Sequence, residues 1–273
     1  MSLNRNQRRL HLNEASVYFH QKGLTPEILD VKLVLFVRRL VKILERRKNH
    51  HRSCDAAREA QRILDLSLHN NLPKQPLQCQ KGCNYCCHNF VSASAPQIFA
   101  IARFVRDTEE VDRKLEEIKS IDDQTRGVER SQRYLSRQSC ALLKDGVCSV
   151  YEHRPTACRG MASHDVETCE KRLDGIHTPP AYEVIRGLVD FAFMAALRVC
   201  QLPLQSYELN HGIRVALEQP DAEQRWLDGE DVFHDVMKDK WIDDPAMSSD
   251  VFLDALVAAV KGNATDILDF QLP

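Results

Sequence analysis

Residues 79–87 read Cys79-Gln-Lys-Gly-Cys83-Asn-Tyr-Cys86-Cys87, and this run places four thiols within nine residues. A hydrophobic core uses cysteine as a small apolar side chain and has no need to gather four of them in one loop. Thiolates are soft ligands that bind zinc and iron–sulfur clusters in preference to magnesium or calcium. Gly82 lacks a β-carbon and so permits the tight turn that a chelating loop needs before Cys83. The run therefore predicts a metal-binding loop.

A second set of cysteines follows the first, so that eight of the ten cysteines lie between residues 79 and 169; its members are Cys140, Cys148, Cys158 and Cys169. Eight thiolates are enough for two four-cysteine sites, or for one iron–sulfur cluster and a separate zinc ion. Adjacent Cys86 and Cys87 point their side chains apart in most backbone conformations, which favours two metals or a polynuclear centre. The other two cysteines, Cys54 and Cys200, lie in helical patterns and are interpreted as packing residues.

The composition is that of a soluble globular protein. The chain has 273 residues, of which 43% are hydrophobic and 28% charged, and it is long enough to bury a sizeable core. The apolar stretches 31–44 and 187–202 contain charged residues and could not span a bilayer, and residues 1–12 lack the apolar run of a secretory signal. We therefore expect a cytoplasmic protein without membrane contact. In a reducing compartment, dense cysteines indicate metal or redox chemistry rather than disulfides.

Charge is distributed unevenly along the chain. Residues 1–70 carry 14 Lys and Arg against 7 Asp and Glu, whereas residues 179–273 carry 7 against 17. The basic amino-terminal helices could therefore bind a protein partner, or they could pair with the acidic carboxy-terminal third of the same chain. Pairing within the chain is the simpler interpretation. Binding to nucleic acid is not expected.

Apolar residues recur at helical spacing through most of the chain. The pattern predicts helices from Thr25 to Leu44, over Asp55–Leu68, over 95–106 with a Ser94–Gln97 capping box, over 109–119, over a solvated 122–136, and over 182–202, 204–217, 221–227 and 250–261. No run alternates with the two-residue period of a strand. Residues 139–178 show no lasting period, and Lys144-Asp145-Gly146 within them reads as a turn.

These patterns predict an all-α fold, in which a helical domain surrounds an irregular, cysteine-rich, metal-binding insert. We expect one domain over residues 1–273. Its basic amino-terminal helices lie within 1–72, its cysteine-cluster core within 73–178, and its acidic carboxy-terminal helices within 179–273.

The second cysteine set carries a specific resemblance. Residues 140–159 contain a Cys140-x7-Cys148 loop with Gly-x-Cys, followed by Tyr151-x2-Arg-Pro-x2-Cys158-Arg159. Together with the run at 79–87, this resembles the YkgJ-type, or CxxCxxCC, cysteine-cluster family of zinc- or iron-chelating domains. Three residues separate Cys79 from Cys83, where the family pattern has two. The resemblance implies that all eight cysteines ligate metal: Cys79, Cys83, Cys86, Cys87, Cys140, Cys148, Cys158 and Cys169.

Two arginines in this segment are expected beside the metal centre. A guanidinium can bind sulfur or a carboxylate, so Arg154 and Arg159 are assigned to contact the bound group. Nearby His88, His153 and His164 are interpreted as neighbours of the ligands rather than ligands.

The sequence predicts a metal-binding protein whose eight-cysteine zinc- or iron-chelating centre serves structure or metal handling. An iron–sulfur cluster is one form of this centre. The Cys79-x3-Cys83-x2-Cys86 spacing also matches radical enzymes with such a cluster, but those enzymes are β/α barrels and the strands they need are missing from the pattern. The alternative is a metal-dependent modification enzyme, of the protein lysine N-methylation or redox type, since some family relatives are linked to flagellin lysine methylation. A closed four-ligand site favours the first function, and an open ligand position favours the second.

Overall fold

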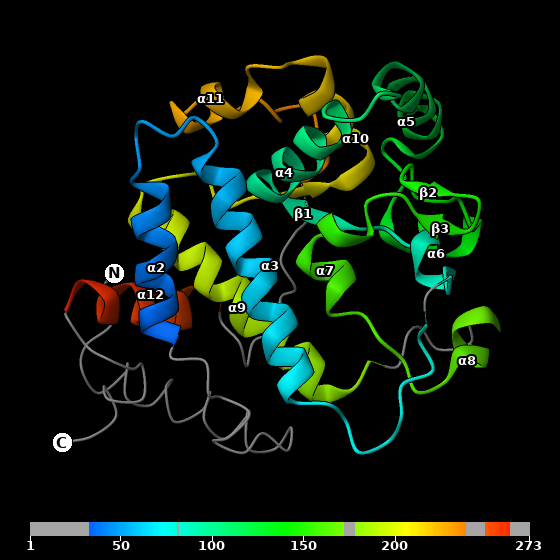
Figure 1. The fold of residues 1–273 in the computed structure, drawn as a ribbon, viewed down its shortest axis with the longest axis horizontal. Helices are drawn as coiled ribbons and strands as arrows, with labels where there is room; N and C mark the ends of the chain where they lie inside the picture. Colours follow the sequence, from blue (N-terminus) through cyan, green and yellow to red (C-terminus); the bar gives the residue numbers. More distant parts are fainter. Residues whose placement is uncertain (1–32, 81, 172–177, 239–248, 263–273) are drawn as a thin grey trace.

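The computed structural model describes residues 33–80, 82–171, 178–238 and 249–262. Helices make up most of these residues and the strands are short, so the all-α prediction is confirmed (Figure 1). The helix predicted to begin at Thr25 is described only from Leu33, because its first part lies outside the described residues. Among the described residues, no helix is long and apolar enough to cross a membrane.

Four helices pack against one another on one side of the molecule. They are α2 (Leu33–Leu44), α3 (Arg52–Asn70), α9 (Pro180–Val199) and α12 (Ser249–Lys261) (Figure 1). Helix α2 buries an apolar face that includes Phe36 and Leu40, as an amphipathic helix must. Helix α9 contacts the other three, buries apolar side chains along its whole length, and corresponds to the helix predicted over 182–202. The basic amino-terminal helices therefore pack directly on elements of the acidic carboxy-terminal third.

A second group of helices packs against α3 through its first member. It consists of α4 (Ala95–Arg106), α5 (Val111–Thr125), α10 (Leu209–Glu218) and the short α11 (Ala222–Leu227). Trp226 of α11 is fully buried, and its ring meets that of Phe99 edge-on at a centroid distance of 5.9 Å. Phe233 stacks on the same Phe99 ring at 5.3 Å. This aromatic cluster joins the carboxy-terminal third to α4.

Two short strands, absent from the sequence prediction, join distant parts of the chain. Strand β1 (Ser92–Ser94) pairs antiparallel with β4 (Ser206–Glu208), with Ala93 opposite Tyr207. The predicted helix over 204–217 consequently begins only at Leu209. Strands of three residues are too short to show a two-residue period, so sequence pattern could not reveal them. The pair matters because β1 leads into α4 and β4 leads into α10.

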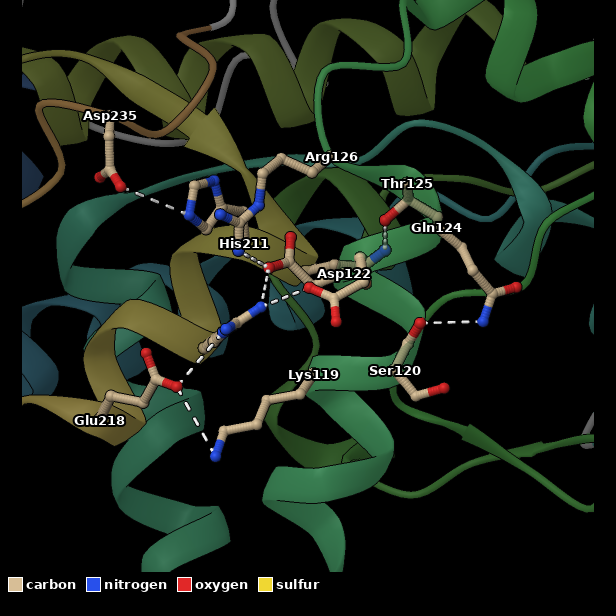
Figure 2. Close-up of polar contacts among 12 residues, drawn as sticks. Lys119, Ser120, Asp122, Gln124, Thr125, Arg126, His211, Glu218 and Asp235 are labelled. Carbon is tan, nitrogen blue, oxygen red and sulfur yellow. Dashed lines mark hydrogen bonds and ion pairs between the residues drawn. The ribbon is translucent and has the colours of Figure 1, made fainter.

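The polar segment 122–136 is largely exposed, as the sequence predicted, but it is not one continuous helix. Its first residues end α5, and a separate helix, α6 (Arg130–Ser136), follows. Asp122 is fully buried. Its carboxylate forms ion pairs with Arg126 and, at 3.0 Å, with Arg214 of α10 (Figure 2). Arg133 of α6 is also buried. Asp122 therefore joins α5 to α10, while most of the other polar residues of this segment are exposed.

The cysteine-rich segment is mostly irregular, as predicted, but it contains several short elements. They are the 3-10 helix η1 (Tyr85–His88), the hairpin of β2 (Leu143–Lys144) and β3 (Val147–Cys148), the 3-10 helix η2 (Tyr151–His153), α7 (Thr156–Arg159) and α8 (Val166–Lys171). The predicted turn is confirmed, because Asp145 and Gly146 adopt φ values of 50° and 77° at the tip of the hairpin. Positive φ at both central residues matches the twist of a two-residue hairpin.

Candidate metal centre

The first cysteine loop is shaped by local backbone hydrogen bonds. Gly82 has a φ of 94°, a conformation that only glycine adopts without strain. The amide of Cys83 donates to the Gln80 carbonyl at 3.0 Å, and the amide of Cys87 donates to the Asn84 carbonyl at 2.9 Å. These two turns coil the chain so that Cys83, Cys86 and Cys87 lie on a compact loop. The role predicted for Gly82 thus has a conformational basis.

Long-range hydrogen bonds bring the second cysteine set onto this loop. The amide of Cys140 donates to the carbonyl of Cys87 at 2.7 Å, and the Asn84 side chain donates to the carbonyl of Gly146 at 3.2 Å. At the other end of the loop, the amide of Ser163 donates to the Cys79 sulfur at 3.2 Å. Two segments some sixty residues apart in the chain are therefore held together at the cysteines.

The segment that carries Cys140 is anchored from the opposite side by α10. The amide of Ala141 donates to the side-chain oxygen of Asn210 at 3.0 Å, and the Asn210 amide group donates to the Thr125 hydroxyl at 3.2 Å. Thr125 belongs to the buried polar contacts of α5 in Figure 2. The polar contacts between α5 and α10 therefore help to position the segment that leads into the β2–β3 hairpin.

The eight thiols form two overlapping electrostatic groups. Burial raises the pKa of Cys79, and negative charge on Cys83, Cys86 and Cys169 raises it further, so Cys79 lies close to these three thiols. Charge on Cys86 and Cys148 likewise raises the pKa of Cys158, whose neighbours include Cys140. Cys86 belongs to both groups and also shares a hydrogen bond with Cys87, which raises its pKa further.

Burial raises the pKa of several of the clustered thiols. It raises the pKa of Cys140 and of Cys158 to about 12. It also raises the pKa of Cys148 and of Cys169. Thiolates gathered at these partly buried positions are unfavourable without a compensating positive charge, which bound metal ions would supply. The chemistry of the donor set therefore fits zinc or iron.

A cavity of about 570 Å³ opens beside the second group. Six of the eight cysteines line it: Cys83, Cys86, Cys87, Cys140, Cys148 and Cys158. Much of the remaining wall is apolar and includes Phe90, Phe193 and Met194. Cys79 and Cys169 do not line this cavity, and Cys169 is a buried residue of α8. The thiols thus border a space large enough for a small molecule.

The two arginines predicted beside the centre occupy different positions. Arg154 lines the cavity, lies over the Tyr151 ring at 3.7 Å, and its charge lowers the pKa of Cys148 and Cys158 against the larger effect of burial. Arg159 is largely buried and forms an ion pair with Asp65 of α3. Its Nε also donates to the Arg154 carbonyl at 2.9 Å. Arg154 therefore faces the thiols directly, whereas Arg159 connects their loop to the helical core.

The histidines in the segment make contacts of their own. The His153 ring stacks on Phe104 with centroids 4.1 Å apart. The Nδ1 atom of His164 lies 3.1 Å from the Pro76 carbonyl oxygen. Both rings are engaged by neighbours other than the cysteines.

Sequence reasoning missed a series of hydrogen bonds between buried polar side chains in the cavity wall. The Gln97 amide donates to the Thr156 hydroxyl at 2.9 Å, and that hydroxyl donates to Oδ1 of Asp190 at 2.6 Å. Burial raises the pKa of the Asp190 carboxyl to about 6, although the Thr156 hydrogen bond and the Arg186 charge lower it. The one available signal was an acidic residue interrupting the apolar stretch of α9.

The same hydrogen bonds contradict the capping box predicted before α4. Ser94 does occupy the N-cap position, but its hydroxyl makes no hydrogen bond to the helix and is buried without a partner. Gln97, predicted to reach back to the cap, is instead directed to Thr156. Tertiary hydrogen bonding has replaced the local cap, and the Ser94 and Gln97 side chains both belong to the cavity wall.

The comparisons with known proteins bear on this segment alone. No curated protein and no solved structure matches the chain. Residues 78–175, which span all eight clustered cysteines, match the model of a family described as a "putative zinc- or iron-chelating domain". The resemblance drawn from the cysteine pattern is therefore confirmed for this part of the chain, because residues 78–175 match the CxxCxxCC family model.

Proposed function

We propose that the eight clustered cysteines hold an iron-containing centre, and that this centre acts on a small ligand bound in the adjoining cavity. The observation that carries the proposal is the position of the cavity, because six of the eight cysteines form part of its wall. A site that served only to stabilise the fold would be closed by its protein ligands, whereas a catalytic site leaves room for water or substrate.

The arrangement of the sulfur atoms favours a polynuclear centre. A single zinc ion with Zn–S bonds of about 2.3 Å holds its four sulfurs about 3.8 Å apart. Among the described residues, no three of the clustered sulfurs lie within 4.8 Å of one another. Cys86 interacts with both groups of thiols, as expected for a ligand near the middle of an extended centre. Iron–sulfur clusters are the usual polynuclear centres with cysteine-only ligation.

The protein residues in the cavity wall have separable roles. An iron centre would supply electron transfer or Lewis acidity to the cavity. Arg154 offsets part of the negative charge of the thiolates. Asp190, oriented by Thr156, provides a carboxylate that can accept a hydrogen bond or a proton from the bound ligand. The apolar side chains around it exclude water from that contact.

A structural zinc site is the second candidate. It is favoured by the group of Cys79, Cys83, Cys86 and Cys169, because two of its members lie away from the cavity. If their sulfurs moved closer together, these four thiolates would close the coordination shell of one zinc ion and would join the loop at 79–87 to α8. This arrangement would fit a structural or metal-handling role.

Metal analysis of protein purified without oxygen from iron-supplemented cells tests the proposal. We expect iron together with broad visible absorption that bleaches on reduction or on exposure to air. The Asp190→Asn variant should retain this iron and its spectrum, because Asp190 faces the cavity and supplies no sulfur. Colourless protein with stoichiometric zinc would overturn the iron centre and leave the structural zinc site as the better account.

A further inference from the structure

A compact group of three metal-binding side chains lies outside the clustered cysteines. It consists of His51 just before α3, Cys54 in the first turn of α3, and Glu223 in α11. One ligand atom of each lies within 4.8 Å of the other two. The Nδ1 atom of His51 is 3.0 Å from Oε2 of Glu223, and the Cys54 sulfur is 3.3 Å from the same oxygen.

We propose that His51, Cys54 and Glu223 form a zinc site that joins the amino-terminal end of α3 to α11 and is separate from the eight-cysteine centre. Histidine nitrogen, cysteine sulfur and carboxylate oxygen are the three ligand types that zinc takes from proteins. Their bond lengths of about 2.0–2.3 Å place tetrahedral ligand atoms roughly 3.3–3.7 Å apart. The observed 3.0 and 3.3 Å separations need to widen by only a few tenths of an ångström.

The local sequence and hydrogen bonding already position the ligands. His51 and Cys54 have two residues between them, a spacing common in zinc half-sites, and the turn of α3 brings both toward α11. The two oxygens of Glu223 are used differently. Oε1 accepts hydrogen bonds from the Ser53 hydroxyl at 2.5 Å and from the Cys54 amide at 3.4 Å, whereas Oε2 faces His51 and Cys54. Hydrogen bonds to the second oxygen are the usual means of fixing a carboxylate that ligates metal.

The charges also balance. A neutral histidine, a thiolate and a carboxylate together carry the two negative charges that one Zn²⁺ neutralises. The thiol proton that now lies between Cys54 and Glu223 would leave to solvent when zinc binds. Burial and the neighbouring Glu223 raise the pKa of the Cys54 thiol, and the charges of Arg103 and Arg58 offset only part of this effect, so a thiolate here needs the positive charge that Zn²⁺ would supply.

Access to the group is from the His51 side. Cys54 is fully buried and Glu223 is mostly buried, whereas half of the His51 side chain is exposed. The fourth coordination position therefore faces solvent and would hold water. The site would act as a clip, because its ligands come from segments about 170 residues apart in the chain.

Zinc titration of the full-length protein tests this site, with His51→Ala as the variant and His50→Ala as its matched control. The neighbouring His50 is also exposed, but it contacts Gln224 rather than Glu223. We expect the wild type and His50→Ala to bind one more zinc ion than His51→Ala. Zinc should also raise their unfolding temperature by an increment that His51→Ala lacks. Comparing increments removes the direct effect of losing the His51–Glu223 contact.

Two further measurements separate this site from the eight-cysteine centre. The Cys83→Ser variant should keep the zinc-dependent increment even if the clustered cysteines lose their metal. Cobalt used as a probe should give a difference spectrum, wild type minus His51→Ala, with the visible bands of tetrahedral cobalt and the absorption of a single thiolate ligand. Equal zinc content and equal temperature increments in wild type and His51→Ala would overturn the site. The three residues would then form only a hydrogen-bonded cap on α3.

Discussion

Glu208 gives the fold a dependence on pH that can be calculated from its surroundings. Its side chain is 4% exposed at the junction of β4 and α10, where it accepts a hydrogen bond from the His211 amide at 2.8 Å. Burial raises the pKa of this carboxyl from 4.5 to about 7, although hydrogen bonds from the His211 and Asn210 amides act in the opposite direction. The folded protein therefore keeps a proton on Glu208 at pH values where the unfolded chain has lost it.

The sign and size of the effect follow from this difference in pKa. Below pH 4.5 both states are protonated at Glu208, and the group adds no pH dependence. As the pH rises toward 7 the unfolded chain releases its proton first, so the free energy of unfolding falls. Each pKa unit corresponds to about 1.4 kcal/mol, and the shift therefore predicts a loss of about 3 kcal/mol across this range.

The Glu208→Gln variant removes the titration and keeps an acceptor for the His211 amide. Urea unfolding of the variant and the wild type, followed by circular dichroism, should be measured between about pH 4 and pH 8. We expect the stability of Glu208→Gln relative to wild type to increase by about 3 kcal/mol over this interval. Any fixed cost of the new amide group is the same at every pH and does not alter the slope.

The matched control is Glu218→Gln, at the other end of α10. Glu218 is partly exposed and forms an ion pair with Arg214. This variant should follow the wild-type profile much more closely. If Glu208→Gln and wild type gave parallel profiles, the raised pKa of Glu208 and the reasoning from burial would both be refuted.

Trp226→Ala should lower the free energy of unfolding by about 3–5 kcal/mol, measured by urea unfolding, because the ring is fully buried against Phe99. Gly212→Ala should destabilise the protein by about 1–3 kcal/mol because the new β-carbon would lie 2.7 Å from Cδ1 of Ile98. Gly187→Ala is its control in α9, where a β-carbon meets nothing within 4 Å, and a loss of the same size there would contradict the packing argument. Serine at Cys83, Cys86 or Cys148 should reduce metal content and expose residues 139–171 to protease, while the surrounding helices survive. Unchanged metal content in all three serine variants would contradict metal ligation by these cysteines.

Sequence periodicity predicted most helices because it reports local burial. The apolar faces of α2, α3, α4 and α9 repeat at helical spacing, and the structure buries those faces. The same reasoning failed where polar residues are buried by distant partners. Asp122 and Arg133 look solvated in sequence, yet both lie inside the fold. Strands β1 and β4 were missed because each has only three residues.

The sequence by itself determined the number, type and local spacing of the clustered thiols, and with them the family of residues 78–175. Coordination chemistry depends first on donor type, and donor type can be read directly from the sequence. Only the tertiary structure decided which groups became neighbours. It placed Asp190 and Thr156 in the wall of the cysteine cavity and brought Glu223 to Cys54. Such contacts join residues far apart in the chain and depend on how whole helices pack, which no local pattern records.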